Sequence, residues 1–210
     1  MITAKEIEGI EIEAWQNMFD IAPPSYKKEM QMSRKHIAGG TCLVFPKYPL
    51  VHFNMVMGLG FSEPITGQVL QEVEQLYANE NQSVYIIHYC EEIQDTNPTN
   101  IFEETNYKAG GGWERIVWKP APITLLQTKR NIHVEKITSA NAAAWEKFII
   151  DCYHYPVKDW LLNFITDGWH HFAAYENGNM IACRSIYTGT NNMAWSGVEA
   201  PVPVVMTNDL

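Results

Sequence analysis

The sequence predicts an α+β fold in which a mixed, mostly antiparallel sheet is flanked by helices. Two observations predict this class. Some stretches repeat apolar residues every three or four positions, as one face of a helix does, and other short runs are rich in β-branched and aromatic residues, as strands are. A third observation is that the order of these segments recurs along the chain. We therefore expect two related units in tandem, the second one incomplete.

The first unit is expected to begin with two helices. Apolar residues follow a near-helical spacing over residues 7–19, and Pro23-Pro24 ends that pattern. A shorter helix is predicted over residues 26–32.

Strands and a central helix are expected next. The runs TCLVFP and LVHFNMVMGLGF predict the two strands of a hairpin, because both are rich in β-branched and aromatic residues. Residues 69–77 then place their apolar side chains on one stripe, which predicts a helix. The run SVYIIHYC predicts a strand that is covered on both faces, since it is apolar almost throughout.

The end of the first unit contains a short helix and a last strand. Asn97-Pro98 offers an N-cap followed by proline, which predicts a helix that runs to Phe102. The run WERIVWK predicts the final strand. The segment that follows breaks the pattern, so we expect a first domain over residues 1–122 and a second over residues 131–210.

The second unit shows a strand, two helices and then an antiparallel meander. The predicted segments are the strand NIHVEKI, helix faces over residues 145–152 and 157–165, and the strands HHFAAYE, MIACRSIY and NMAWSGVEA.

Two dipeptides indicate that the second unit repeats the first. Ile37-Ala38 corresponds to Ile181-Ala182, and Asn54-Met55 corresponds to Asn192-Met193. In the first unit the strand that starts at Asn54 is followed by further helices and strands, whereas little chain follows the equivalent strand of the second unit. Either the chain is truncated, or a partner chain supplies the missing elements in a homodimer.

Composition limits the classes of partner. The chain has 210 residues, is 46% hydrophobic and carries a formal charge of −9, which argues against nucleic acid and permits a cationic substrate such as an amine. No apolar run has the length of a membrane span, and the amino terminus does not resemble a signal peptide, so we expect a cytoplasmic protein.

The sequence shows no pattern of metal ligands. The four cysteines are widely spaced, which predicts reduced thiols and neither a disulfide scaffold nor a zinc site. His170 and His171 are neighbours on a predicted strand and would point to opposite faces. His88 and Cys90 share a strand face but lack further ligands nearby in the sequence, so core packing is the expected role.

The order of segments resembles the acyl-CoA-dependent N-acyltransferase (GNAT) superfamily, and in particular its tandem members with a degenerate amino-terminal copy. In the first unit FNMVMGLG is similar to the family's fourth strand, SEPITGQVL to its cofactor loop and the start of its third helix, and IFEETNYK to the end of its fourth helix. The resemblance implies acetyl-CoA as the cofactor and a small-molecule amine as the acceptor.

Site residues follow from this resemblance. It places cofactor binding at Leu59, Gly60, Gly67 and Gln68, where glycines and a helix amino terminus suit a pyrophosphate. The family's general acid is a tyrosine whose position here is occupied by Phe102, which cannot donate a proton.

In the second unit the resemblance makes Glu199 the candidate general base, because a carboxylate near the acyl carbon can deprotonate an ammonium nucleophile. An exposed carboxylate at a strand end is the alternative role for this residue. Tyr153, Tyr155 and Trp160 lie near the break between two predicted helices, which in the resembled fold forms a wall of the acceptor site. Core packing is the alternative role for these three aromatic residues.

Two functions remain open. One is an N-acyltransferase that moves an acetyl group from acetyl-CoA to an amine. The other is a catalytically silent GNAT-like module for binding or dimerisation. It is favoured by Phe102 and by the loop of residues 63–68, which has one glycine, a proline that removes an amide donor, and an acidic residue close by.

Overall fold

The computed structural model describes residues 2–48, 50–90, 92, 99–112, 114–119, 121–122, 131–154 and 157–202. The chain divides into two compact units, Met1–Lys119 (unit 1) and Pro120–Leu210 (unit 2). Each unit has a four-stranded sheet of its own.

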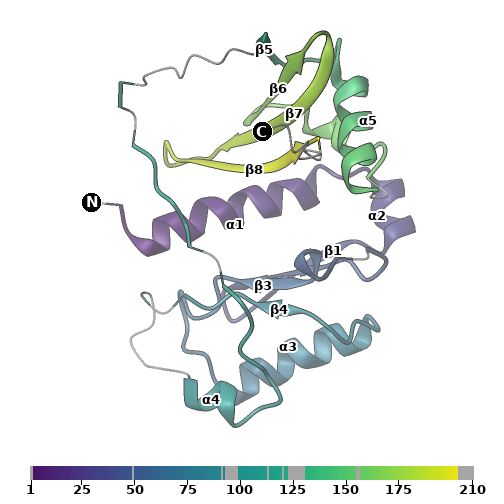
Figure 1. Cartoon of the computed structure of the whole chain (residues 1–210). Helices are drawn as coiled ribbons and strands as arrows, with labels where there is room; N and C mark the ends of the chain where they lie inside the picture. Colours follow the sequence, from purple (N-terminus) through teal and green to yellow (C-terminus); the bar gives the residue numbers. More distant parts are fainter. Residues whose placement is uncertain are drawn as a thin grey trace, which may run out of the picture. The chain divides into compact units, whose positions relative to one another are not determined.

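Unit 1 is a sheet with helices on both faces. Its elements are α1 (Ala4–Asp20), α2 (Pro24–Met30), β1 (Ser33–Ile37), β2 (Gly40–Val44), a 3₁₀ turn (Val51–Phe53), β3 (Met55–Met57), α3 (Gly67–Asn79), β4 (Ile86–Ile87) and α4 (Thr99–Glu103). The strand order is β1-β2-β3-β4, in which the first three strands are antiparallel and β4 is parallel to β3. Figure 1 shows α1 on one side of this sheet and α3 with α4 on the other.

Helix α1 begins and ends for local reasons. Thr3 is the N-cap, and its side chain and that of Glu6 satisfy each other's backbone amides in a capping box. The buried side chains Ile10, Ala14 and Met18 recur at a spacing of four and form the face that packs on the sheet. The sequence prediction of this helix is confirmed.

The core of unit 1 lies on both faces of β2 and β3. Every residue of these two strands is buried, because helices cover the sheet on either side. On the face of α3, Leu70, Val73 and Tyr77 pack into a cluster with strand residues. The Tyr77 hydroxyl donates a hydrogen bond of 2.8 Å to the carbonyl of Leu43, which satisfies its buried oxygen.

Unit 2 is an antiparallel sheet with a helix packed on one face. Its elements are β5 (Ile132–Lys136), α5 (Ala142–Tyr153), a 3₁₀ turn (Leu161–Phe164), β6 (Trp169–Glu176), β7 (Asn179–Thr188) and β8 (Ala194–Pro201). The strand order is β5-β6-β7-β8, and every neighbouring pair is antiparallel. Trp145 of α5 is fully buried and packs on His171 of β6, with ring centroids 4.4 Å apart.

The α+β class, with mostly antiparallel sheets flanked by helices, is confirmed. Two element predictions are wrong, and a third is confirmed only over part of its length. Residues 114–119 of the run WERIVWK form no strand, and the Ile116 side chain is 93% exposed. The helix expected over residues 157–165 is reduced to the 3₁₀ turn, although Trp160 and Phe164 are buried as expected. The strand expected over SVYIIHYC pairs with β3 through only two residues, which are half-buried.

Strand β1 was not predicted, because its residues are mostly polar. Ser33–Ile37 lies at the edge of the sheet, where charged side chains such as Arg34 and Lys35 can reach solvent. The hairpin turn that joins it to β2 places Ala38 and Gly39 at positive φ.

The structure contradicts the equivalence predicted from one of the two dipeptide matches. Ile37 ends β1, the first strand of its meander, whereas Ile181 lies within β7, the second strand of its meander. These two positions are therefore not equivalent. Asn54 and Asn192 both precede the third strand of a meander, β3 and β8, so that match is compatible with the element order.

None of the helices in the described part of the chain is long and apolar enough to cross a membrane.

Candidate functional site

The four predicted cofactor residues lie in the loop between β3 and α3 and in the first turn of α3. Strand β3 ends at Met57, and Gly58 and Gly60 at positive φ turn the chain away from the sheet. Leu59 is buried in the core cluster, so only its backbone could meet a ligand. Gly60 is half-buried, and Gly67 and Gln68 form the exposed first turn of α3.

The first turn of α3 presents backbone donors. Thr66 is the N-cap, and its hydroxyl accepts a hydrogen bond from the amide of Val69 at 3.2 Å. Within the described residues, the amides of Gly67 and Gln68 donate to no other group, as expected for the start of a helix. An anion is favoured at such a helix end by these amides and by the helix dipole.

A buried ion-pair cluster on α1 was not anticipated. Arg115 donates from Nη1 to Glu8 Oε1 and from Nε to Glu11 Oε2, both at 2.7 Å. The two carboxylate side chains are only 6% and 9% exposed. Burial raises the pKa of Glu8, the Arg115 charge opposes this, and the charges of Glu11 and Glu92 add to it.

His88 lies next to this cluster, at the end of the β3–β4 ladder. Its backbone amide donates to the carbonyl of Val56 at 2.9 Å, so the residue follows the last paired position of β4. The pKa of His88 is lowered to about 4, chiefly by burial and then by the charges of Arg115 and His52. The imidazole is therefore neutral at pH 7.

Cys90 is two residues further along and is not an activated thiol. Its Sγ donates to Glu92 Oε2 at 3.3 Å, and burial raises its pKa to about 11, with that hydrogen bond as the next contribution. A thiol rather than a thiolate is present at pH 7, so nucleophilic catalysis by Cys90 is disfavoured.

The sequence contained a signal for one member of the ion-pair cluster, Glu11. Glu11 follows Ile7 by four residues and precedes Ala14 by three, which puts a carboxylate on the apolar stripe of α1. A charge at such a position needs a partner. The sequence could not identify Arg115 as that partner, because the two residues are 104 positions apart.

The structure brings two of the predicted unit 2 residues together. Glu199 on β8 pairs through Oε2 with Arg184 on β7, at 2.7 Å from Nε and with a second contact from Nη2. The Tyr153 hydroxyl, at the end of α5, donates to the backbone carbonyl of Glu199. The Glu199 and Arg184 side chains are more than half exposed.

The other two predicted unit 2 residues do not join them. Trp160 is 2% exposed and packs edge-to-face against Phe164, with centroids 5.7 Å apart, so it contributes to the core. Tyr155 lies outside the described residues.

His171 and Ser185 form a buried pair in unit 2. Ser185 Oγ lies 2.7 Å from Nδ1 of His171, and Nε2 of the same ring lies 2.8 Å from the carbonyl of Phe164. Because a carbonyl only accepts, the neutral ring donates from Nε2 and accepts the Ser185 proton at Nδ1. Both residues are at most 1% exposed, so the pair stabilises the core and cannot meet a substrate.

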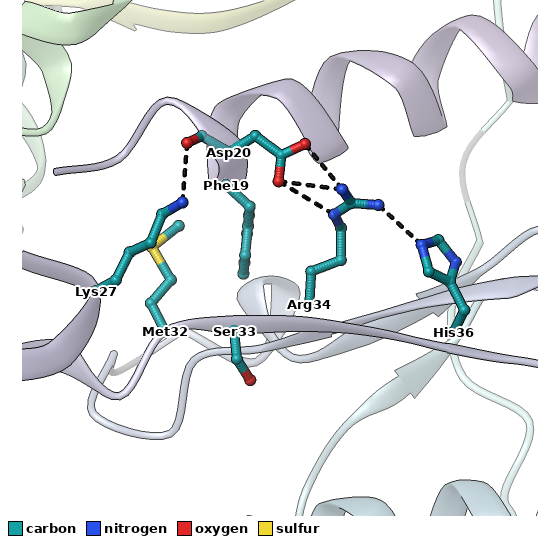
Figure 2. A pocket seen from close by; sticks show the side chains of 7 residues that line it. All are labelled: Phe19, Asp20, Lys27, Met32, Ser33, Arg34 and His36. Atoms are coloured by element: carbon teal, nitrogen blue, oxygen red, sulfur yellow. Dashed lines mark hydrogen bonds and ion pairs between the residues drawn. The ribbon is translucent and has the colours of Figure 1, made fainter. Parts of the chain in front are cut away.

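Two cavities lie elsewhere. One, of about 240 Å³ in unit 1, is lined by Phe19, Asp20, Lys27, Met32, Ser33, Arg34 and His36. Figure 2 shows Asp20, Lys27, Arg34 and His36 reaching toward one another, while Ser33 points away from them. The other, of about 330 Å³ in unit 2, is bordered by Lys136–Ser139 and Ile165–His171. None of the predicted site residues lines either cavity.

Metal binding finds no support in the described residues, where no group of three His, Cys, Asp or Glu side chains is arranged to hold an ion.

Comparisons with known proteins identify the fold. No protein-family model and no curated protein matches the sequence. A GCN5-related N-acetyltransferase from Kribbella flavida superposes with a TM-score of 0.62 at 8% identity, over 99% of this chain and 76% of that chain. A functionally unknown conserved protein from Staphylococcus epidermidis aligns at 12% identity over 87% of this chain and 77% of that chain, and its TM-score of 0.42 is too low to add to the argument. The chain therefore has a GNAT-like fold, the fold of the GCN5-related N-acetyltransferases.

Proposed function

We propose that the protein is an acyl-CoA-dependent N-acyltransferase that moves an acetyl group from acetyl-CoA to a small-molecule amine. The observation that carries the proposal is the start of α3 in unit 1. In a GNAT-like fold, the amides of Gly67 and Gln68 follow β3 at the position where a pyrophosphate would bind. Gly60 and the backbone of Leu59 lie in the same loop.

Acetyl transfer requires a proton acceptor. The amine nitrogen forms a bond to the thioester carbon, the carbon–sulfur bond breaks, the CoA sulfur leaves as a thiolate that then takes up a proton, and a base takes the proton that the amine loses. Each unit offers one candidate for the base. In unit 1 it is the neutral imidazole of His88, beside the β3–β4 ladder. In unit 2 it is Glu199, whose carboxylate the amine would have to share with or take from Arg184.

Cofactor binding is tested by calorimetric titration with acetyl-CoA. A methyl group at Gly67 meets no atom within 4 Å, so Gly67→Ala should fold normally. The methyl group should nevertheless block access of the pyrophosphate to the backbone amides and lower the affinity for acetyl-CoA at least tenfold. Gly9→Ala is the matched control, because its site on α1 is equally open and belongs to no predicted site. Absence of binding to the wild-type protein at millimolar acetyl-CoA contradicts the proposal.

The base is tested by single substitutions. Replacement of the true base should lower turnover about 10²- to 10⁴-fold while acetyl-CoA affinity stays unchanged. His88→Gln and Glu199→Gln distinguish the two units. If neither variant loses activity, both assignments are wrong.

A silent binding module is the second candidate. It is supported by Pro64, which removes one amide donor from the loop. It is also supported by Phe102, which packs against Tyr89 and Tyr107 and has no hydroxyl group to donate a proton. Acetyl-CoA binding without turnover against a panel of amines would favour this function over the first.

A further inference from the structure

In the described part of the chain, segment 114–119 forms hydrogen bonds and ion pairs with the rest of unit 1 through the Arg115 side chain. Among the described residues its backbone makes no hydrogen bond to another segment, and it forms neither helix nor strand. Ile116 and Trp118 are 93% and 65% exposed. Arg115 is the exception, since its guanidinium reaches the buried carboxylates of α1.

The Arg115 site has the properties of a cation subsite. Glu8 and Glu11 are one helical turn apart on α1 and present two buried carboxylates to a single guanidinium. Buried carboxylates need a positively charged partner that donates hydrogen bonds. A side chain of the protein can be this partner, and so can the guanidinium or ammonium group of a ligand. Arg115 Nη2 is buried and has no hydrogen-bond partner among the described residues, so the guanidinium does not use all of its donors.

The cluster also adjoins the candidate base of unit 1. The Arg115 charge contributes to the lowered pKa of His88, which places the two side chains within electrostatic reach of each other. A cationic ligand bound between Glu8 and Glu11 would lie in the same region.

We propose that Arg115 is an autoinhibitory latch: its guanidinium occupies a subsite formed by Glu8 and Glu11, and a small guanidinium or ammonium ligand enters this subsite by displacing segment 114–119. The identification of that ligand with the amine acceptor rests on the proposed acyltransferase function. The displacement itself does not.

Agmatine, which carries both a guanidinium and a primary ammonium, is the probe for the full-length protein. Its affinity is measured by calorimetry without acetyl-CoA. Solvent exchange of the Arg115 Nε proton, which the hydrogen bond to Glu11 Oε2 protects, is followed by nuclear magnetic resonance. The latch predicts that agmatine increases the exchange of this proton and that Arg115→Ala binds agmatine at least tenfold more tightly than the wild-type protein. Glu8→Gln/Glu11→Gln in the Arg115→Ala background should abolish the binding.

Two further variants keep the test decisive. Arg115→Lys preserves a positive charge but loses the two-pronged geometry, so it should fold and bind agmatine several-fold more tightly than wild type. Lys119→Ala, an exposed charge in the same segment, should bind as wild type does. Unchanged affinity in a folded Arg115→Ala variant, or in Arg115→Lys if the alanine variant does not fold, overturns the latch. Binding that survives the loss of both carboxylates does the same.

The two proposals fail separately. If agmatine releases the segment but acetyl-CoA does not bind, the latch stands and the acyltransferase function falls. If acetyl-CoA binds and is turned over but agmatine releases nothing, the function stands and the latch falls.

Discussion

His88 and Glu8 are two ionisable residues of unit 1 that protein burial moves toward their neutral forms. Burial lowers the pKa of His88 and raises that of Glu8, because a charge loses hydration inside the protein. The two shifts act on stability in opposite directions as the pH falls. His88 binds its proton later in the folded state than in the unfolded state, whereas Glu8 binds its proton earlier in the folded state.

Acid should destabilise the fold through His88. In the unfolded chain His88 takes up a proton below about pH 6.5, whereas in the folded chain it does so only near pH 4. The free energy of unfolding should therefore fall between these two pH values, by at most about 3 kcal/mol. The measurement is urea unfolding at several values between pH 7 and pH 4, for the wild-type protein and for His88→Gln.

His133→Gln is the matched control for this experiment. His133 is exposed in unit 2, so the variant should keep the acid slope of the wild-type protein. His88→Gln should flatten that slope. If His88→Gln shows the same dependence of stability on pH as the wild-type protein, another group causes the loss of stability in acid.

Among the elements, the connection between β2 and β3 depends on one buried amide side chain. Asn54 Oδ1 accepts a hydrogen bond from the Phe45 amide at 2.7 Å, and its Nδ2 donates to the Phe45 carbonyl at 3.1 Å. The side chain thus replaces a backbone partner where the hairpin pairing ends. Phe45 is fully buried, so its backbone groups have no water to bond to instead.

Loss of this side chain should destabilise unit 1. Asn54→Ala leaves the buried Phe45 amide without a partner, whereas the Phe45 carbonyl keeps the hydrogen bond that it accepts from the Tyr48 amide, so the free energy of unfolding should fall by about 1–3 kcal/mol. Equilibrium unfolding in urea measures the change.

The control for Asn54 is the other asparagine of the Asn-Met match. Asn192 is exposed and has φ of 54°, a conformation that glycine adopts freely, so Asn192→Gly should change stability by less than about 0.5 kcal/mol. Equal losses at both positions would contradict the structural difference between them.

At the scale of the whole molecule, each unit has its own sheet and its own buried residues. The sheet of unit 1 has helices on both faces, and the sheet of unit 2 packs on α5. A chain of about 120 residues is long enough to bury a stable core.

Unit 1 should therefore fold by itself. A fragment of residues 1–119 is expected to show a cooperative thermal transition, together with near-ultraviolet circular dichroism from packed aromatic pairs such as Trp15 with Phe53. A broad, non-cooperative transition without that signal would show that unit 1 needs unit 2.

Some of the candidate site was accessible from sequence. Helix α3 follows from the apolar stripe of residues 69–77, which is a local feature, and the family resemblance placed the cofactor loop immediately before it. The ion pairs of Arg115 and the contact between Tyr153 and Glu199 were not accessible, because each joins residues that only folding brings together. Trp160 illustrates the ambiguity of an aromatic residue near a helix break, since core packing and ligand binding share the same pattern.

The sequence by itself determined the α+β class, the positions of α1, α3 and α5, and the strands β2, β3 and β5 to β8, because periodicity and turn chemistry act over a few residues. The tertiary structure decided what lies at long range. It placed the polar strand β1 at a sheet edge, limited β4 to two pairs, and left the strand-like run at residues 114–119 outside the sheet. Pairing partners and burial settle these outcomes, and both depend on contacts between distant parts of the chain.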